Sequence, residues 1–260
     1  LECVNEESMS VSQRVTQNQY FIYLRKRKEE TDMELLEEIL NQNNLNKAYK
    51  KVVANKGVAG VDGITVEEEF DYLKENKDRI LNQIRKRKYK PQPVKRVQIP
   101  KENGKMRNLG IPTVTDRIIQ QAIFQVISPI FEKQFNDNSF GFRPNRSCEQ
   151  AVIRALEYLN DGYEWIVDID LEKFFDTVNQ DKLITIIGKT ITDGDVVSLI
   201  RKYLSAGVME KGIVKPTYVG TPQGGNLSPL LSNIMLNELD KELEARGLNF
   251  VRYADDCIIL

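Results

Sequence analysis

A pair of adjacent acids, Asp255 and Asp256, lies between two short strand-forming runs near the end of this 260-residue chain. The runs are 250–252 before the acids and 257–260 after them. Strand-forming residues on both sides of a short polar turn are typical of a hairpin, so we expect the acids at its tip. Acidic turns are also common for local hydrogen-bonding reasons, so the pair alone does not define a functional site.

A second acidic strand end lies upstream, where the run 165–170 contains Asp168 and Asp170. A fold that brings Asp170 next to Asp255 would allow two carboxylates to hold a pair of divalent cations, as in two-metal phosphoryl transfer. Asp168 would share a strand face with Asp170, because side chains two residues apart point the same way. For Asp168 we favour a structural role, as the buried partner of a neighbouring cation.

The residue types that are missing exclude several kinds of site. The chain contains no histidine, which excludes Ser-His-Asp and Cys-His nucleophilic sites, His-ligated zinc and an imidazole base. The three cysteines, Cys3, Cys148 and Cys257, fit neither a zinc nor a disulfide pattern. A reducing, cytosolic compartment is the simplest inference. No apolar run approaches the length of a membrane span, so we expect no membrane partner.

Positive charge is concentrated in parts of the N-terminal half, although the formal net charge is only −1. The stretch 85–107 contains ten Lys or Arg residues and one acid, Glu102, and 25–28 is a second basic run. Such tracts can follow a phosphate backbone, because affinity for nucleic acid depends on the local number of phosphate contacts. The alternative for each run is a solvated helix face.

The periodicity and the turn residues predict a mixture of helices and hairpins, typical of an α+β fold. One helix is expected to end before Pro129, and another to start with Ser228 as its N-cap and Pro229 in its first turn. The dipeptide Asn103-Gly104 predicts a hairpin turn. The expected helices cover 31–49, 65–84, 118–127, 147–159, 181–187, 193–204 and 228–243, and the expected strands and hairpins cover 94–109, 164–170, 208–219 and 250–260.

Four segments, in this order and spacing, resemble the fingers and palm of reverse transcriptases. They are 101–112, 170–175, 221–230 and 253–256. Within that class the chain is similar to the reverse transcriptases encoded by group II introns, also called maturases, because it also contains the segments 60–65 and 139–147. Any one segment could arise by chance, whereas four in the same order are specific. The resemblance covers residues 45–260.

The resemblance implies a right-hand polymerase fold, with reverse-transcriptase fingers and palm, a helical N-terminal extension and a small antiparallel palm sheet. It divides the chain into a basic N-terminal extension (1–60), fingers (61–160) and a palm (161–260). Members of the family continue beyond the acidic hairpin into a helical thumb that clamps the duplex. We therefore expect a truncated fragment in which the thumb is absent, and which polymerises weakly if at all.

By resemblance, the catalytic carboxylates are those of Asp170, Asp255 and Asp256. Asp170 and Asp255 are expected to bridge two Mg²⁺ ions, with Mn²⁺ as a substitute. Asp256 is the supporting acid, and the backbone carbonyl of Leu171 completes the shell of one metal. Oxygen ligands suit these hard cations. Positioning and charge stabilisation dominate the catalysis of an in-line displacement at phosphorus.

The incoming deoxynucleoside triphosphate is expected to contact a second group of residues. Lys101 and Arg107 flank the fingers turn and are expected to bind the triphosphate, although their charge would equally suit the backbone of the template RNA. Phe175 matches the family's steric gate, which excludes a ribose 2′-hydroxyl. On a strand-like path, one of Phe174 and Phe175 would pack in the core while the other lines the site. Two loop residues complete the group: Gln223 and Gly224.

The resemblance implies two functions: binding of group II intron RNA to assist splicing, and copying of an RNA template from a DNA primer for intron mobility. One alternative is a fragment that acts only as an RNA-binding splicing cofactor. Another is a reverse transcriptase from a retron, a diversity-generating element or a CRISPR-linked system, although segment 60–65 favours group II. A bacterial cytoplasm and a homodimer are further expectations. The residues expected to bind RNA are Arg25, Lys26, Arg27, Lys28, Arg85, Lys86, Arg87, Lys88 and Arg143.

Overall fold

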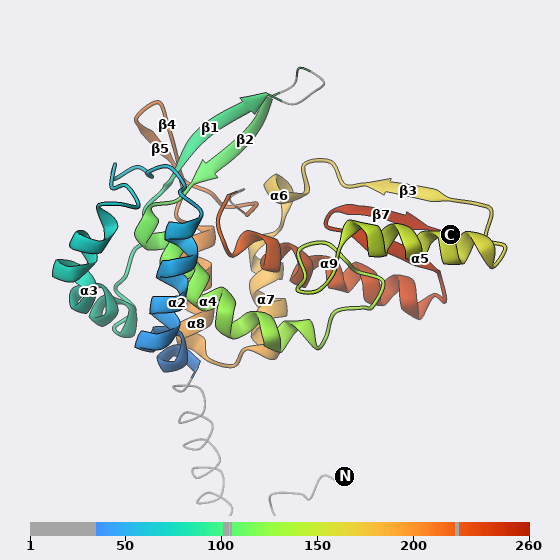
Figure 1. Cartoon of the computed structure of the whole chain (residues 1–260), viewed down its shortest axis with the longest axis horizontal. Helices are drawn as coiled ribbons and strands as arrows, with labels where there is room; N and C mark the ends of the chain where they lie inside the picture. The colour runs from blue at the N-terminus through green and yellow to red at the C-terminus, as the bar shows by residue number, and fades with distance from the viewer. Residues whose placement is uncertain (1–34, 101–103, 105, 222–223) are drawn as a thin grey trace, which may run out of the picture.

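The computed structural model describes residues 35–100, 104, 106–221 and 224–260, and for Arg107 it describes the backbone only (Figure 1). The basic run 25–28 and the helix start expected at 31 lie outside these residues, as do Lys101 and Gln223. The first described helical residues are 35–40.

A layer of helices around α4 forms the larger part of the molecule (Figure 1). The helix α4 is apolar on most of its faces and is buried along most of its length, as expected for a helix at the centre of a core. Ile123 and Ile127 of α4 are fully buried, and the helix packs against α2, α3 and α9. The helices of this layer are α2 (Gln42–Ala54), α3 (Glu69–Arg85), α4 (Val114–Glu132), α7 (Gln180–Thr190), α8 (Gly194–Leu204) and α9 (Ser228–Ala245).

Helix α4 continues past Pro129 to Glu132, so the prediction that it ends before the proline was wrong. Proline removes one backbone N–H, and therefore one helical hydrogen bond, within the helix. Phe131 lies beyond the proline and is buried in the main core. Burial of the last turn offsets the lost hydrogen bond, which the sequence alone does not reveal.

The basic segment forms the predicted hairpin, from β1 (Val94–Pro100) and β2 (Met106–Ile111). The antiparallel pairing runs from Lys95 opposite Ile111 to Pro100 opposite Met106. A second hairpin, β4 (Val208–Glu210) and β5 (Ile213–Lys215), joins it through a short parallel pairing of β4 with β1. The resulting hairpin sheet has the strand order β2-β1-β4-β5. In Figure 1 the β1–β2 hairpin projects away from the helical layer.

The acidic hairpin, β6 (Phe250–Tyr253) and β7 (Asp256–Ile259), pairs with β3 (Val167–Asp170) to form an acidic sheet of order β3-β7-β6. Neighbouring side chains of a strand point to opposite faces. Accordingly, Cys257 packs in a cluster with Leu243 of α9. Ile258 packs in a different cluster, with Ala151 of α5 (Cys148–Asn160). The sheet is therefore held between two helices.

The N-cap residue agrees with the predicted helix start in α5 and differs from it by one residue in α9. Ser147 is the N-cap of α5 and forms a capping box with Gln150. Ser228 was predicted as the N-cap of α9, whereas it is the first residue of the helix and Leu227 occupies the cap position. The shift by one residue keeps Pro229 in the first turn, where its missing N–H costs little.

The hairpin sheet combines strands from both sides of the expected boundary at residue 160, because β4 pairs with β1. The division of the chain into 1–60, 61–160 and 161–260 stays a prediction. None of the helices in the described ranges combines the length and the apolar character needed to cross a membrane.

Candidate active site

The strand pairing brings together the two acidic segments that are far apart in the sequence. In the β3–β7 ladder Asp170 lies directly opposite Asp256. In the β6–β7 ladder Tyr253 lies opposite the same Asp256, so Ala254 and Asp255 form the turn between the strands. Ala254 has a positive φ of 58°, as a tight turn of this kind requires. One edge of the acidic sheet therefore presents Asp170, Asp255 and Asp256 together.

Electrostatic repulsion is concentrated at this edge. The pKa of Asp256 is raised, first by partial burial and then by the negative charges of Asp255, Asp170 and Asp168. Mutual repulsion of close carboxylates favours the protonated form of one of them. A divalent cation would relieve this repulsion, because it neutralises the excess negative charge.

Asp168 does not have the role expected for it. Its side chain is exposed, and it forms no ion pair with another described residue. It lies opposite Ile258, on the same sheet face as Asp170 and Asp256. Instead of being neutralised by a buried cation, Asp168 adds to the negative charge beside Asp256.

The acids fit a divalent cation by donor type and by charge. Carboxylate oxygens are the ligands preferred by Mg²⁺. Leu171, whose carbonyl is the further expected ligand, follows the last residue of β3 directly. Within the described ranges, however, no three Cys, Asp or Glu side chains are already grouped closely enough to hold a metal. The backbone thus brings the donors to one edge, and the side chains would have to turn to form the metal site.

Arg252 holds the acidic turn through contacts on the side of the sheet that faces α9. The sequence predictions did not identify this residue. Its side chain is fully buried and pairs with the equally buried Asp240 of α9 at 2.5 Å. All five guanidinium N–H groups of an arginine are used here. The acceptors are Oδ1 and Oδ2 of Asp240 (2.7 and 2.5 Å), Oδ1 of Asn233 (3.1 Å), the carbonyl of Ala254 (2.8 Å) and Oγ of Ser139 (2.8 Å).

The segment 139–143 supports the same turn from the other side. The N–H of Phe140 donates to the carbonyl of Arg252 at 2.8 Å. Gly141 lies so close to the turn that a Cβ atom there would be 2.2 Å from the N of Ala254. The amide of Asn233 donates to the carbonyl of Gly141 at 2.9 Å. The segment resembling the family pattern at 139–147 therefore contributes to the shape of the acidic turn.

Arg143 was predicted to bind RNA, and the structure does not support that role. Its side chain is 3% exposed and pairs with Glu132 at 2.8 Å. One guanidinium nitrogen donates to the carbonyls of Asn136 and Ser139, both at 2.6 Å. The guanidinium also lies 5.4 Å from the ring centre of Phe135. Because these contacts surround the group, we assign Arg143 a structural role in holding the 136–143 segment.

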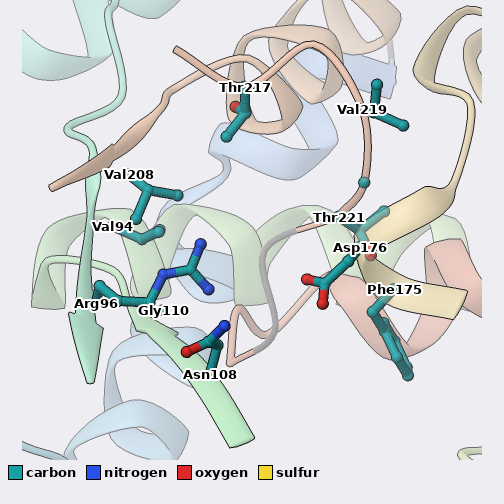
Figure 2. Close-up of a pocket in the computed structure, with 11 residues that line it drawn as sticks. Val94, Arg96, Asn108, Gly110, Phe175, Asp176, Val208, Thr217, Val219 and Thr221 are labelled. Atoms are coloured by element: carbon teal, nitrogen blue, oxygen red, sulfur yellow. The ribbon is translucent and has the colours of Figure 1, made fainter. Parts of the chain in front are cut away.

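Phe175 lies in a short helix, α6 (Phe174–Thr177), and not on the strand-like path that was expected. The predicted division between the two rings, one packed in the core and the other lining the site, stays a prediction, because Phe175 is the more buried of the two at 8% exposure. Phe174 packs against the main helical core, whereas Phe175 lines a cavity of about 270 Å³ between α6 and the hairpin sheet (Figure 2). The rings meet edge to face, with their centres 5.6 Å apart.

The loop before α9 rests on the base of the basic hairpin. Gly224 has a φ of +112°, and a Cβ atom there would be 2.5 Å from the carbonyl oxygen of Gly110. Only glycine permits this approach without strain. Arg107 lies on β2 opposite Ile99, which places it near the outer end of the same hairpin. The roles expected for Arg107, Gly224, Lys101 and Gln223 stay predictions.

The basic run at the end of α3 is exposed along its whole length. Arg85 makes a two-pronged ion pair with Glu37, at 2.7 and 2.8 Å. Arg87 pairs with Asp195. Exposed ion pairs of this kind contribute little to stability, so they do not prevent contact with a polyanion. The RNA-binding role of Arg85, Lys86, Arg87 and Lys88 stays a prediction.

We predict that Arg252→Met lowers the free energy of unfolding by about 3–5 kcal/mol, because Asp240 would be left buried and unpaired. The matched control is Arg246→Met, which breaks an exposed ion pair with Glu242 and should cost at most about 1 kcal/mol. Urea denaturation of both variants measures the difference. Equal costs for the two substitutions would contradict the anchoring role of Arg252.

Comparison with known proteins identifies the family. Residues 99–260 match the family described as "Reverse transcriptase (RNA-dependent DNA polymerase)". Over 212 residues the chain is 41% identical to "Group II intron-encoded protein LtrA" of Lactococcus lactis subsp. cremoris, which covers 81% of this chain and 35% of that protein. It is 38% identical over 211 residues to "Protein YkfC" of Escherichia coli (strain K12), covering 79% of this chain and 55% of that protein.

A solved structure, "Partial Cas6-RT-Cas1--Cas2 complex", superposes with a TM-score of 0.57 at 24% identity. The match covers 87% of this chain and 38% of that chain, and at this identity it shows the fold alone. The chain spans about a third of the length of LtrA and about half the length of YkfC. With the fingers-palm architecture and the family match together, the chain belongs to the reverse transcriptases and is similar to those encoded by group II introns.

Proposed function

We propose that the protein copies RNA into DNA by two-metal nucleotidyl transfer and also binds group II intron RNA to assist splicing. The observation that supports the polymerase role best is the β3–β7 register. It sets Asp170 opposite Asp256, next to Asp255, in a chain whose family is named for RNA-dependent DNA polymerisation. The activity is proposed for the full-length protein, because the curated relatives extend well beyond the matched region.

In this proposal Asp170 and Asp255 hold two Mg²⁺ ions, for which Mn²⁺ can substitute. Asp256 is the supporting carboxylate, and the carbonyl of Leu171 is a further ligand. Bound in this way, the ions would activate the primer 3′-hydroxyl and stabilise the charge of the triphosphate. Arg252 is not a ligand, but its contact with the carbonyl of Ala254 would keep the acidic turn in one conformation.

The substrates in this proposal are deoxynucleoside triphosphates and an RNA template paired with a DNA primer. Lys101 and Arg107 would bind the triphosphate from the basic hairpin, where a guanidinium can make two parallel hydrogen bonds to phosphate. The ring of Phe175 would close the space that a 2′-hydroxyl needs. Gln223 and Gly224 would contact the nucleotide and the template from the loop before α9.

We predict that Asp255→Asn in the full-length protein lowers Mg²⁺-dependent cDNA synthesis by about 100-fold or more, because one metal ligand loses its charge. The control is Asp161→Asn, an exposed acid at the end of α5, which should leave synthesis unchanged. Primer extension on an RNA template measures both. Undiminished synthesis by Asp255→Asn would rule out the metal assignment.

A second candidate function, RNA binding without polymerisation, is favoured by the exposed basic run 85–88. Its position at the end of α3 separates it in sequence from the acidic sheet, so the two functions can be tested independently. The expected partner is a folded intron RNA, whose phosphates would contact this run and the run 25–28. Both functions are compatible in one chain.

Replacing the four residues of 85–88 by Gln should weaken intron-RNA binding and flatten its salt dependence, by up to about one unit of log–log slope for each lost phosphate contact. A matched control replaces four exposed cations elsewhere: Lys182, Lys189, Lys241 and Arg246. Filter binding at several salt concentrations gives affinity and slope. If the 85–88 variant keeps both, this surface does not bind the RNA.

A further inference from the structure

The cavity beside Phe175 contains charges of both signs, one on each of two structural elements (Figure 2). Arg96 and Asn108 enter it from the basic hairpin, and Asp176 enters it from α6. The other lining residues are Val94, Gly110, Phe175, Val208, Thr217, Val219, Gly220 and Thr221.

Arg96 and Asp176 face each other across this cavity without being paired. In Figure 2 the guanidinium of Arg96 and the carboxylate of Asp176 point toward each other from opposite walls. Neither side chain makes a hydrogen bond or an ion pair with another described residue, although the charge of Arg96 contributes to lowering the pKa of Glu210, after the larger effect of Lys215. Arg96 lies opposite Gly110 in the β1–β2 ladder, so no side chain on the neighbouring strand blocks its path into the cavity.

The basic hairpin is attached to the rest of its sheet only at its base. Strand β1 pairs with β4 through Val94 and Lys95 alone. From Arg96 to Pro100, β1 pairs with β2 alone. Arg96 is the first residue of β1 beyond the pairing with β4.

The opposite wall, in contrast, is fixed. The N–H of Thr221 donates to the carbonyl of Phe175, and the N–H of Gly220 donates to the carbonyl of Val178, both at 2.7 Å. A Cβ atom at Gly220 would lie 2.9 Å from the carbonyl oxygen of Asp176, so the two segments are in close contact. Thr221 is 3% exposed and lines the cavity, and its hydroxyl is buried without a hydrogen-bond partner among the described residues.

We propose that Arg96 and Asp176 form an ion pair that fixes the basic hairpin over α6 when a deoxynucleotide is bound. The inference rests on the proposed polymerase function and adds two positioning residues to it. Asp176 directly follows Phe175 in this fixed wall, so an ion pair at Asp176 would set the position of the hairpin relative to the ring that is proposed to contact the sugar. The same pair fixes the hairpin that carries Arg107. Arg96 and Asp176 thus control nucleotide affinity and sugar selection without touching the reacting atoms.

A charge exchange tests this pair. Arg96→Asp and Asp176→Arg, made singly in the full-length protein, should each raise the KM for deoxynucleotides about tenfold or more, with a smaller change in kcat. The preference for deoxynucleotides over ribonucleotides should fall in both. The double variant, in which the charges are exchanged, should recover most of the affinity and of the preference. A purely structural role for either residue would not produce this recovery.

Three controls make each outcome decisive. Lys211→Asp makes the same charge change in the exposed β4–β5 turn and should have no effect. The milder Arg96→Gln and Asp176→Asn, checked by thermal melting, should also raise KM if the charge-reversal variants fold poorly. The ion pair would be overturned if the double variant had a KM for deoxynucleotides as high as that of the more impaired single variant. Single variants with an unchanged KM would overturn it too. Retained synthesis by Asp255→Asn would instead overturn the metal assignment on which the polymerase proposal rests.

Discussion

The buried pair of Arg252 and Asp240 is the interaction on which the acidic turn depends. A buried guanidinium is stable only when its charge and its donors are satisfied. Here one carboxylate balances the charge, and the remaining donors bind a side-chain amide, a hydroxyl and a backbone carbonyl. These acceptors come from α9, from Ser139 and from the turn itself. One side chain thereby joins three segments beneath Asp255.

The buried acid Asp240 and the acids of the exposed edge are in different electrostatic environments. Asp240 is neutralised below the sheet by Arg252, so its charge is balanced in the interior. The acids on the exposed edge are not balanced, and the pKa of Asp256 is raised first by partial burial and then by the charges of its acidic neighbours. A fold that retains such repulsion at one edge, while satisfying a buried charge a few residues away, is suited to receive cations there. The same edge lies in a chain of the reverse transcriptase family.

Much of the local structure could be predicted from the sequence, because its causes are local. Asn103-Gly104 between alternating residues specifies the basic hairpin, and the acid pair between two strand-forming runs specifies the acidic one. The predicted approach of the two acidic segments also agrees with the β3–β7 pairing. It came from the resemblance to a known family and not from any local signal.

The errors concern residues whose partners meet only after folding. Arg143 reads as a free cation in the sequence, but Glu132 and two carbonyls surround it in the structure. Pro129 reads as a helix end, but core packing carries α4 past it. Arg252 could have been suspected, because it is a charged residue inside an otherwise apolar and aromatic strand. Its partner Asp240 could not be identified without the fold.

Metal binding at the acidic edge is the central claim, and Mn²⁺ titration followed by electron paramagnetic resonance tests it most directly. The account predicts that the 260-residue chain binds Mn²⁺ and that the double variant Asp170→Asn/Asp255→Asn loses this binding. Mg²⁺ should displace the bound Mn²⁺, because both are hard cations that favour carboxylate oxygen. Equal Mn²⁺ binding by the chain and by the double variant would contradict the account.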